Sequence, residues 1–305
     1  MAKRDFITIR SYTPAETRKL IDDAIDIKAH PGKYAEALKG KALGMIFEKP
    51  SLRTRVTFDV GIHQLGGFGI YLSPAEISLG KRESVADVAR NLERMVQGIM
   101  ARTFSHKVVE ELAACARIPV INGLTDYNHP CQAMADYMTL LEVKGELSGL
   151  KLAYLGDGNN VAVSLIHTAA RLGVHLAVAT PAGYEPNPEA VEWGRAQGAE
   201  TGCRIDLTHD PVEAVKGADA VYTDVWTSMG QESEAAKRLA ILRPYQVNEA
   251  LFAKARPDAV FLHCLPAHRG EEVTDEVVDS PRSVVIQQAE NRLHSQKAIM
   301  LHLMR

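Results

Sequence analysis

The chain has 305 residues and a mass of 33.4 kDa, about the length of two ordinary domains. Hydrophobic residues make up 46% of it and charged residues 24%, which excludes a disordered chain, a fibrous repeat and a small disulfide scaffold. Basic residues number 35 and acidic residues 38, a formal net charge of −3, so a protein that holds nucleic acid on a broad basic surface is not expected.

Two features of the sequence bear on its location. The N-terminal stretch MAKRDFITIRSYTPAETRKL lacks the apolar core of a secretion signal, and no apolar run reaches membrane-spanning length. The cysteines have no paired spacing, which favours a reducing compartment; they are Cys115, Cys131, Cys203 and Cys264. We therefore expect a cytoplasmic protein with no membrane anchor.

Short apolar runs alternate with amphipathic stretches, which is the pattern of repeated β-α units around parallel sheets. The predicted strands of the first half are 41–47, 68–72, 96–101 and 117–121. The predicted helices of this half are 14–29, 53–65, 84–94, 106–115 and 132–145.

After a hinge at LSGLK (147–151), the second half begins with a new strand. The strands predicted there are 151–156, 175–180, 203–209, 219–224 and 259–265, with 283–288 as a further candidate. The terminal stretch 289–304 has helical spacing and is expected to pack on the first half. We therefore predict an α/β fold of two domains, each a parallel β-sheet flanked by helices. The predicted domains are 1–146 joined by a C-terminal helix at 289–305, and 147–288.

Unusual polar residues follow the predicted strands. There are six such clusters: SLRTR (51–55), Arg102, HPCQ (129–132), GDGNN (156–160), DVWTSMG (224–230) and HCLP (263–266). In open α/β sheets, ligands bind at the carboxyl ends of the strands. Six clusters from two half-chains therefore predict one ligand-binding cleft that both domains line.

The cluster SLRTR runs from a predicted strand into a helix, whose first N–H groups and positive dipole end bind anions. Ser51 and Thr54 add hydroxyl groups. The guanidiniums of Arg53 and Arg55 suit phosphate oxygens. The alternative is a capping serine followed by solvated arginines, one of them in an ion pair. Arg102 has a similar alternative, as a surface ion pair.

The cluster HPCQ places His129 and Gln132 just before a predicted helix, where both can donate to a carbonyl or an oxyanion. A loop histidine without such a role is the alternative. Zinc binding is a further possibility to consider, because His129 lies near Cys131 in the sequence and His263 is next to Cys264. Neither pair has the repeated ligand spacing of a structural zinc site, so no metal is expected.

The cluster GDGNN lies between a predicted strand and a helix, as a dinucleotide-binding loop would. That loop requires G-x-G-x-x-G, and Val161 stands where the third glycine belongs. No acidic residue ends the next strand, which closes with Thr180. The sequence therefore argues against NAD, and no cofactor is expected. Asn159 and Asn160 either cap the helix or bind a ligand carboxylate.

The last two clusters supply a carboxylate and a thiol. Asp224 suits an ammonium group, and Ser228 adds a small hydroxyl. Cys264 ends a predicted strand, and a nucleophilic cysteine needs an adjacent base. His263 points to the opposite face if the strand continues, so no covalent thioester is expected. Arg292 is predicted near the start of the final helix, where a solvated arginine is the alternative to a ligand-binding one.

Taken together, SLRTR, HPCQ, DVWTSMG and HCLPAHRGEEV resemble the ornithine carbamoyltransferase family. The similarity extends along essentially the whole chain, including GDGNN and the closing AENRLHSQKAI. The first motif is shared across the carbamoyltransferase superfamily. The others are typical of ornithine enzymes, since aspartate enzymes typically carry HPLP in place of HCLP and putrescine enzymes lack the serine–methionine–glycine loop.

The resemblance implies a site for two substrates. The phosphate of carbamoyl phosphate would be bound by Ser51, Leu52, Arg53 and Thr54, with Arg102. The carbamoyl group would be held by His129 and Gln132, and that side of the site would be completed by Cys264, Leu265 and Arg292. The α-carboxylate and α-amino group of L-ornithine would be held by Asn160, Asp224, Ser228 and Met229. The residues expected to take part in catalysis are Arg102, His129, Cys264, Thr54 and Asp224.

The resemblance also implies a mechanism and an assembly. The neutral δ-amine of ornithine attacks the carbamoyl carbon directly and phosphate leaves, with no covalent enzyme intermediate. The usual assembly is a trimer or a multiple of trimers, with sites near the subunit contacts. Many members reach a neighbouring phosphate site with a glutamine from a segment like EISLGKRES (76–84), where Ser78 stands here.

Two other functions stay open at this point. A carbamoyltransferase with another amino acceptor would share the first motif. A two-domain solute-binding protein also closes over a small ligand, although it usually carries a secretion signal. The sequence leaves open whether such an enzyme serves arginine synthesis or citrulline degradation.

Overall fold

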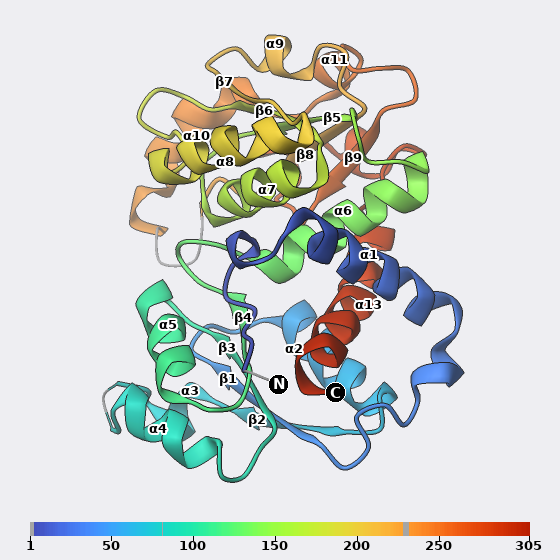
Figure 1. Cartoon of the computed structure of the whole chain (residues 1–305). Helices are drawn as coiled ribbons and strands as arrows, with labels where there is room; N and C mark the ends of the chain where they lie inside the picture. Colours follow the sequence, from blue (N-terminus) through green and yellow to red (C-terminus); the bar gives the residue numbers. More distant parts are fainter. Residues whose placement is uncertain (1–2, 81, 228–231) are drawn as a thin grey trace. The chain divides into compact units, whose positions relative to one another are not determined.

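The computed structural model describes residues 3–80, 82–227 and 232–305. The chain divides into two compact units, one formed by Met1–Met138 with Asn291–Arg305 and the other by Thr139–Glu290. Figure 1 shows a β-sheet with helices around it in each unit. The predicted fold class is confirmed, including a C-terminal helix that returns to the first unit.

The first unit contains a four-stranded parallel sheet in the order β2-β1-β3-β4. Its strands are β1 (Ala42–Phe47), β2 (Phe68–Leu72), β3 (Gly98–Arg102) and β4 (Val120–Leu124). Its helices are α1 (Pro14–Ala29), α2 (Leu52–Gln64), α3 (Pro74–Ile77), α4 (Val85–Leu92) and α5 (His106–Cys115), with 3-10 turns η1 (Ile9–Ser11) and η2 (Pro31–Tyr34). It also contains the first part of α6 (Pro130–Lys144) and most of α13 (Val285–Met304).

The second unit contains a five-stranded parallel sheet in the order β7-β6-β5-β8-β9. Its strands are β5 (Lys151–Leu155), β6 (His175–Ala179), β7 (Ile205–Thr208), β8 (Ala220–Thr223) and β9 (Val260–His263). Its helices are α7 (Asn160–Leu172), α8 (Pro188–Thr201), α9 (Pro211–Val215), α10 (Ala235–Leu242), α11 (Glu249–Phe252) and α12 (Asp275–Val278), with 3-10 turns η3 (Glu232–Glu234) and η4 (Arg243–Tyr245).

The central strands are buried on both faces, as a parallel sheet covered by helices requires. Every residue of β1 and β3 is buried, whereas the edge strand β2 exposes Phe68 and Ile70. In the second unit, Leu155, Val221 and Phe261 from three adjacent strands belong to one buried apolar cluster. The short apolar runs of the sequence therefore form the buried central strands of the two sheets.

The strand order of each sheet creates a switch point. This is the place between two adjacent strands from which the chain continues to one side of the sheet after one strand and to the other side after its neighbour. In the first sheet, the chain passes from β1 to β2 on one side and then crosses to β3 on the other. In the second sheet, β5 and β8 are neighbours while the chain between them visits β6 and β7. Ligands of open α/β sheets bind at the carboxyl ends of the strands beside such a point.

Two predictions about the elements need correction. The strand predicted at 117–121 is β4, which starts later, because Pro119 has no N–H to give to a neighbouring strand. The strand predicted at 283–288 is wrong: Ser283 makes one isolated bridge to Phe261, and α13 starts at Val285. Buried Val285, Gln288 and later residues follow helical spacing, which decides in favour of the helix.

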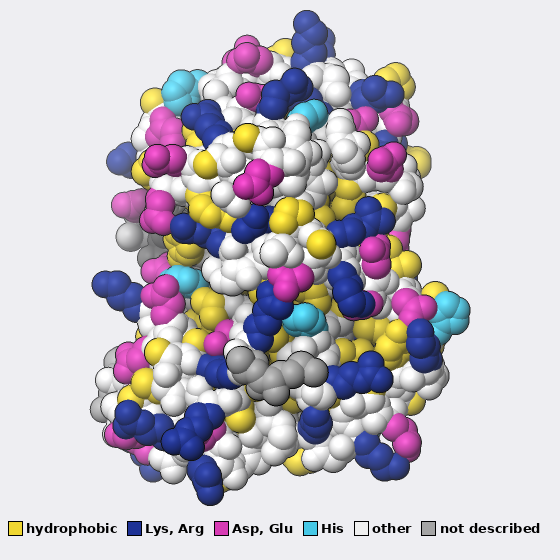
Figure 2. Space-filling view, viewed as in Figure 1, with side chains coloured by type: hydrophobic (Ala, Val, Ile, Leu, Met, Phe, Trp, Pro, Cys, Tyr) yellow, Lys and Arg dark blue, Asp and Glu magenta, His cyan; other side chains and the backbone are white. Residues whose placement is uncertain are grey.

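Charged side chains of both signs are mixed on the face of the molecule that Figure 2 shows. Figure 2 shows lysine and arginine side chains interspersed with aspartate and glutamate over the visible face, in keeping with the net charge of −3. Among the helices of the described ranges, none has both the length and the apolar character needed to cross a membrane.

Candidate active site

Ser51 begins α2 shortly after β1. Its backbone is extended, and its hydroxyl oxygen accepts a hydrogen bond from Thr54 N–H at 3.2 Å, so it is the N-cap of the helix. Leu52 is exposed, whereas Thr54 is fully buried. The capping alternative is therefore correct for Ser51. It is compatible with anion binding, because other N–H groups of the first turn have no partner within the helix.

The two arginines of this motif lie in different surroundings. The guanidinium of exposed Arg55 lies 3.9 Å from the centre of the Tyr71 ring. Arg53 is half-buried, and its charge lowers the pKa of His129. One arginine is thus held by an aromatic ring, in place of the ion pair considered from the sequence, and Arg53 belongs to the candidate site.

Arg102 and Arg292 reach the first unit's site from distant parts of the chain. Arg102 is the last residue of β3 and is 6% exposed, and Arg292 lies in α13 and is 3% exposed. Nη2 of Arg292 donates to Thr54 Oγ1 at 2.7 Å, which joins α13 to α2. The surface interpretations of both arginines are therefore wrong. For Arg292 the reason is that α13 starts at Val285, so this arginine lies well inside the helix.

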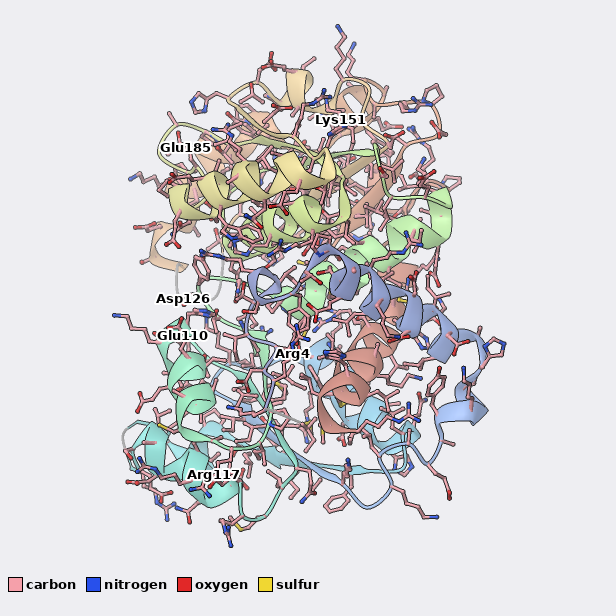
Figure 3. The ribbon with its side chains drawn as sticks, in the orientation of Figure 1. Arg4, Glu110, Arg117, Asp126, Lys151 and Glu185 are labelled. Atoms are coloured by element: carbon pink, nitrogen blue, oxygen red, sulfur yellow. The ribbon has the colours of Figure 1, made fainter. Side chains whose placement is uncertain are left out.

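The loop before α6 holds His129 at the carboxyl end of β4. Thr125 N–H donates to Asn128 O at 3.0 Å, which closes the turn that precedes His129. Asp126 accepts from His106 N–H at 2.8 Å, and Figure 3 shows it beside the start of α5. The turn is therefore tied both to itself and to a neighbouring helix.

His129 is an uncharged imidazole surrounded by positive charge. It is 4% exposed, and burial lowers its pKa well below the usual range. Three positive charges nearby lower the pKa further, in decreasing order those of Arg292, Arg102 and Arg53. The ring is therefore a neutral hydrogen-bonding group near neutral pH. Three arginines around one neutral ring favour the binding of an anion.

Gln132 lies in the first turn of α6, not before the helix as predicted. Its Nε2 donates to Asp136 Oδ1 at 2.8 Å, and both side chains are buried. A carboxylate only accepts hydrogen bonds, so Asp136 fixes the amide with its nitrogen on that side. Gln132 Oε1 is buried and makes no hydrogen bond within the described ranges, so it keeps its capacity to accept one.

Cys131 is a buried thiol with a hydrogen-bond partner in the main chain. Its thiol donates to Asn122 O at 3.3 Å, and burial raises its pKa to about 12. This environment favours the neutral thiol over the thiolate. Cys131 is therefore a buried structural residue.

In the second unit, Asp224 collects hydrogen bonds from the ends of three strands. It follows β8 and is buried. Its Oδ1 accepts from the Cys264 thiol at 2.9 Å and from Val225 N–H at 2.8 Å. Its Oδ2 accepts from Asn159 Nδ2 at 2.8 Å. Because β5, β8 and β9 are adjacent in the sheet, the loops that follow them meet at this carboxylate.

The two asparagines after β5 have different positions. Asn159 is the N-cap of α7, and its Oδ1 accepts from Val161 N–H at 2.9 Å. Asn160 is the first helical residue and is half-buried. The capping interpretation is therefore correct for Asn159, and ligand binding stays a prediction for Asn160. Ser228 and Met229 lie outside the described residues, so their role also stays a prediction.

Gly158 is explained by a backbone contact. A Cβ atom at this position would lie 2.2 Å from Pro186 N and 2.4 Å from Glu185 C. Gly158 N–H donates to Tyr184 O at 2.8 Å, and Figure 3 labels Glu185 in the loop concerned. In a dinucleotide site the corresponding glycine makes room for a pyrophosphate. Here it makes room for the chain itself.

The side chains of His263 and Cys264 lie closer together than they would on the opposite faces of a continuing strand. The strand ends at His263, so its alternation does not extend to Cys264, and donor atoms of His263, Cys264 and Asp224 lie within 4.8 Å of one another. Both ring nitrogens are already engaged: Nδ1 accepts from Leu265 N–H at 2.8 Å, and Nε2 lies 3.2 Å from Glu272 Oε1. A metal ion at this cluster would have to displace one of these hydrogen bonds.

An ion pair that the sequence does not predict supports the loops around Asp224. Asp157 accepts a hydrogen bond from buried Arg238 of α10, and Arg238 Nε donates to Trp226 O at 2.6 Å. Arg238 thereby joins the loop after β5, through Asp157, to the loop after β8, through Trp226. In the sequence Arg238 is one basic residue of an amphipathic helix, and no local pattern distinguishes it.

The residues around His129 in the first unit and those around Asp224 in the second unit form two clusters, which suit ligands of opposite charge. The first unit offers three guanidiniums, a helix start and a neutral imidazole, which fit a phosphate with a carbonyl attached. The second unit offers a buried carboxylate held by a thiol, an amide and a backbone N–H, which fits a ligand that carries an amine.

The pKa of His129 predicts a measurable pH dependence of stability. The folded chain holds this ring neutral, whereas in the unfolded chain it gains a proton below a pH of about 6.5. The free energy of unfolding therefore falls as the pH falls below that value. In His129→Gln this contribution is absent, so the variant should lose less stability, by up to about 1.4 kcal/mol per pH unit. Urea unfolding of both proteins at pH 7.5 and 5.5 measures it, and parallel losses would contradict the assignment.

Comparison with known proteins places the chain in a family. Residues 4–142 match the model of the aspartate/ornithine carbamoyltransferase carbamoyl-P binding domain, and residues 148–303 match that of the Asp/Orn binding domain. The chain is 55% identical to an ornithine carbamoyltransferase of Thermococcus kodakarensis, over 100% of this chain and 97% of the relative. It is 53% identical, with the same coverage, to a protein of Pyrococcus furiosus named anabolic ornithine carbamoyltransferase. The solved ornithine carbamoyltransferase from Pyrococcus furiosus matches it with a TM-score of 0.97, at 53% identity, over 99% of this chain and 97% of that one. The chain belongs to the aspartate/ornithine carbamoyltransferase family.

Proposed function

We propose that this chain transfers the carbamoyl group of carbamoyl phosphate to the δ-amine of L-ornithine, giving L-citrulline and phosphate. The observation that carries the proposal is the arrangement of Arg53, Arg102 and Arg292 around neutral His129 beside the start of α2. The names of the relatives support ornithine as the acceptor. We assign carbamoyl phosphate to a domain of residues 1–146 with the C-terminal helix 289–305, and ornithine to residues 147–288.

Carbamoyl phosphate is bound at the start of α2. Its phosphate is held by Ser51, Leu52, Arg53 and Thr54, with Arg102. Its carbamoyl group is held by His129 and Gln132, and that side of the site is completed by Cys264, Leu265 and Arg292. The amide orientation of Gln132 supports this assignment, because Oε1 is an acceptor with no partner in the described ranges and the carbamoyl NH₂ group is a donor.

Ornithine is bound at the carboxyl ends of β5 and β8. Its α-carboxylate and α-amino group are held by Asn160, Asp224, Ser228 and Met229. The buried carboxylate of Asp224 supports this assignment, since an ammonium group is its natural counter-charge. The helix start at Asn160 likewise favours a carboxylate.

The reaction is a direct attack by the neutral δ-amine on the carbamoyl carbon, with phosphate as the leaving group. Thr54, Arg102 and His129 stabilise the oxyanion that develops, and Arg53 with the helix start stabilises the departing phosphate. No covalent enzyme intermediate forms. Cys264 supports that point, because its thiol donates a hydrogen bond to the carboxylate of Asp224 and is thereby held in the protonated form, which is not the nucleophile.

The acceptor is tested by citrulline formation. We expect rapid turnover with ornithine and little with the other acceptors, because putrescine has no α-carboxylate, acetylornithine has no free α-amine and aspartate has no δ-amine. Phosphate should be released from carbamoyl phosphate only when ornithine is present. Turnover of another acceptor would favour a different carbamoyltransferase. Tight ligand binding with no phosphate release would favour a solute-binding protein.

The role of Arg102 is tested by Arg102→Ala. Loss of one group that stabilises charge in the transition state should lower kcat by about 10²- to 10³-fold. Arg55→Ala is the matched control, because Arg55 belongs to the same basic motif but stacks on Tyr71, and it should keep most of the activity. Circular dichroism and thermal unfolding accompany the kinetics. If Arg102→Ala loses its fold, Arg102 is a structural residue.

We also propose that the chain forms a homotrimer or a multiple of trimers. An exposed apolar patch supports self-association: Leu52, Val56 and Val60 project from α2 at intervals of one turn, and Phe68 and Ile70 are exposed on the edge strand β2 beside it. The four cysteines lie in the described residues and form no disulfide, which supports the proposed cytoplasmic location. The anabolic name of one relative supports a role in arginine synthesis.

Sedimentation velocity tests the assembly. We expect a trimer or larger species for the parent chain, and dissociation in the double variant Val56→Glu, Val60→Glu, because two charges would be buried in the interface. Val212→Glu changes an equally apolar exposed residue on α9, and it should sediment as the parent does. A parent chain that sediments as a 33.4 kDa monomer would overturn the proposal.

A further inference from the structure

The segment between Cys264 and Glu271 forms a loop that is closed by two fully buried side chains. His263, at the end of β9, is 1% exposed, and Glu272, which follows the loop, is 0% exposed. His263 Nε2 lies 3.2 Å from Glu272 Oε1. The two side chains therefore join the ends of the loop that carries Cys264 and Leu265.

The hydrogen bonds of His263 assign its tautomer. Leu265 N–H donates to Nδ1 at 2.8 Å, so Nδ1 has a free lone pair and the ring proton is on Nε2. That N–H donates to Glu272 Oε1, which also accepts from His268 N–H at 2.5 Å. The carboxylate thus selects the tautomer in which Nδ1 can accept from the loop.

Leu265 has a backbone conformation that needs such support. Its φ is 58°, in the left-handed region that favours glycine and is unfavourable for a leucine. The hydrogen bond from its N–H to His263 Nδ1 compensates part of that cost. The main chain on the other side of Cys264 is fixed as well, since His263 N–H donates to Gln288 Oε1 at 2.9 Å.

Cys264 lies between these two fixed points. Its thiol donates to Asp224 Oδ1 at 2.9 Å, and the same carboxylate is held by Asn159. A change in the path of the loop would therefore move both the thiol and the main chain of Leu265 relative to Asp224.

We propose that His263 and Glu272 are a positioning pair that sets the conformation of the Cys264–Leu265 segment for carbamoyl transfer. Neither side chain touches a substrate. Glu272 orients the ring of His263, and His263 Nδ1 holds Leu265 in its left-handed conformation. The catalytic part of this inference rests on the proposed function, whereas the conformational part does not.

Two substitutions at His263 separate positioning from bulk structure. In His263→Asn, the side-chain oxygen takes the place of Nδ1 and still accepts from Leu265 N–H. In His263→Gln, the side chain still reaches Glu272 but has no acceptor at that place. We expect kcat to fall by about 10²-fold in His263→Gln, as for a small misplacement of reacting groups, with most of it retained in His263→Asn. Glu271→Gln is the matched control for the loop and should behave as the parent.

Thiol alkylation gives a readout that does not need activity. Iodoacetamide labelling at Cys264 is followed by peptide mass spectrometry and compared with Cys115, a half-buried thiol on α5. The Cys264 to Cys115 ratio should rise in His263→Gln and stay near the parent value in His263→Asn. Equal kinetic losses in both variants that follow their melting temperatures, with an unchanged ratio, would overturn the proposal. If no carbamoyl transfer is found at all, the labelling ratio still decides the conformational part.

Hydrogen exchange on the unaltered chain tests the same point if the variants do not fold. Site-resolved mass spectrometry should find the Leu265 amide protected by its bond to His263. The amide of Ala267, which makes no hydrogen bond in the described parts of the chain, should exchange faster. Equal exchange at the two amides would overturn the proposal.

Discussion

The parallel order of the strands is the constraint on which both clusters depend. The carboxyl ends of all strands in a parallel sheet lie at one edge, and a switch point separates the two loops that leave its central strands. In the first unit the central strands are β1 and β3: Ser51 lies in the loop after β1, and Arg102 is the last residue of β3. In the second unit the two loops follow β5 and β8. There, Asn159 Nδ2 donates to Asp224 Oδ2 at 2.8 Å. Residues far apart in the sequence therefore meet because of the strand order.

Burial then decides the chemistry of these residues. His129 would be a cation at a slightly acid pH in water, but burial and three guanidiniums hold its pKa well below the usual range. The ring can therefore act as a donor or acceptor without adding a fourth positive charge. Cys131, two residues later, is affected in the opposite sense, since burial raises the pKa of a group whose charged form is negative. One environment thus yields a neutral imidazole and a neutral thiol.

The sequence predicts the β-α order well because each element has a strong local pattern. The strand β2 and the helices α1 and α5 have the predicted bounds, and the apolar runs end where turn residues begin. The errors have a different origin. The run at 283–288 is apolar and β-branched, but its burial follows helical spacing once α13 packs on the first unit. The solvated alternative for Arg292 fails for the same reason, since only the tertiary fold shows that Thr54 accepts its hydrogen bond.

Contacts across long separations explain what the sequence could not reveal about the site. Arg238 pairs with Asp157, and Glu272 orients His263, yet each looks like an ordinary charged residue in its own segment. The residues that local patterns do identify, such as Ser51 and Asn159, have a second role as helix caps. A cap fixes its own side chain, which leaves the adjacent helix N–H groups to face outward from the strand ends. The same residue thereby starts the helix and prepares its N-terminus for an anion.

Local placement of charge also explains the near-neutral composition. A small anion is held by a few guanidiniums that converge on one point, so it does not require the basic surface that a polyanion needs. Of the three arginines around His129, Arg53 and Arg102 are 49 positions apart and Arg102 and Arg292 are 190 positions apart, and no run of basic residues marks them. The carboxylate of Asp224 supplies the opposite charge in the other unit, again as a single buried group. Recognition of two small charged molecules therefore leaves almost no trace in the net charge of the chain, and it must be sought at the strand ends.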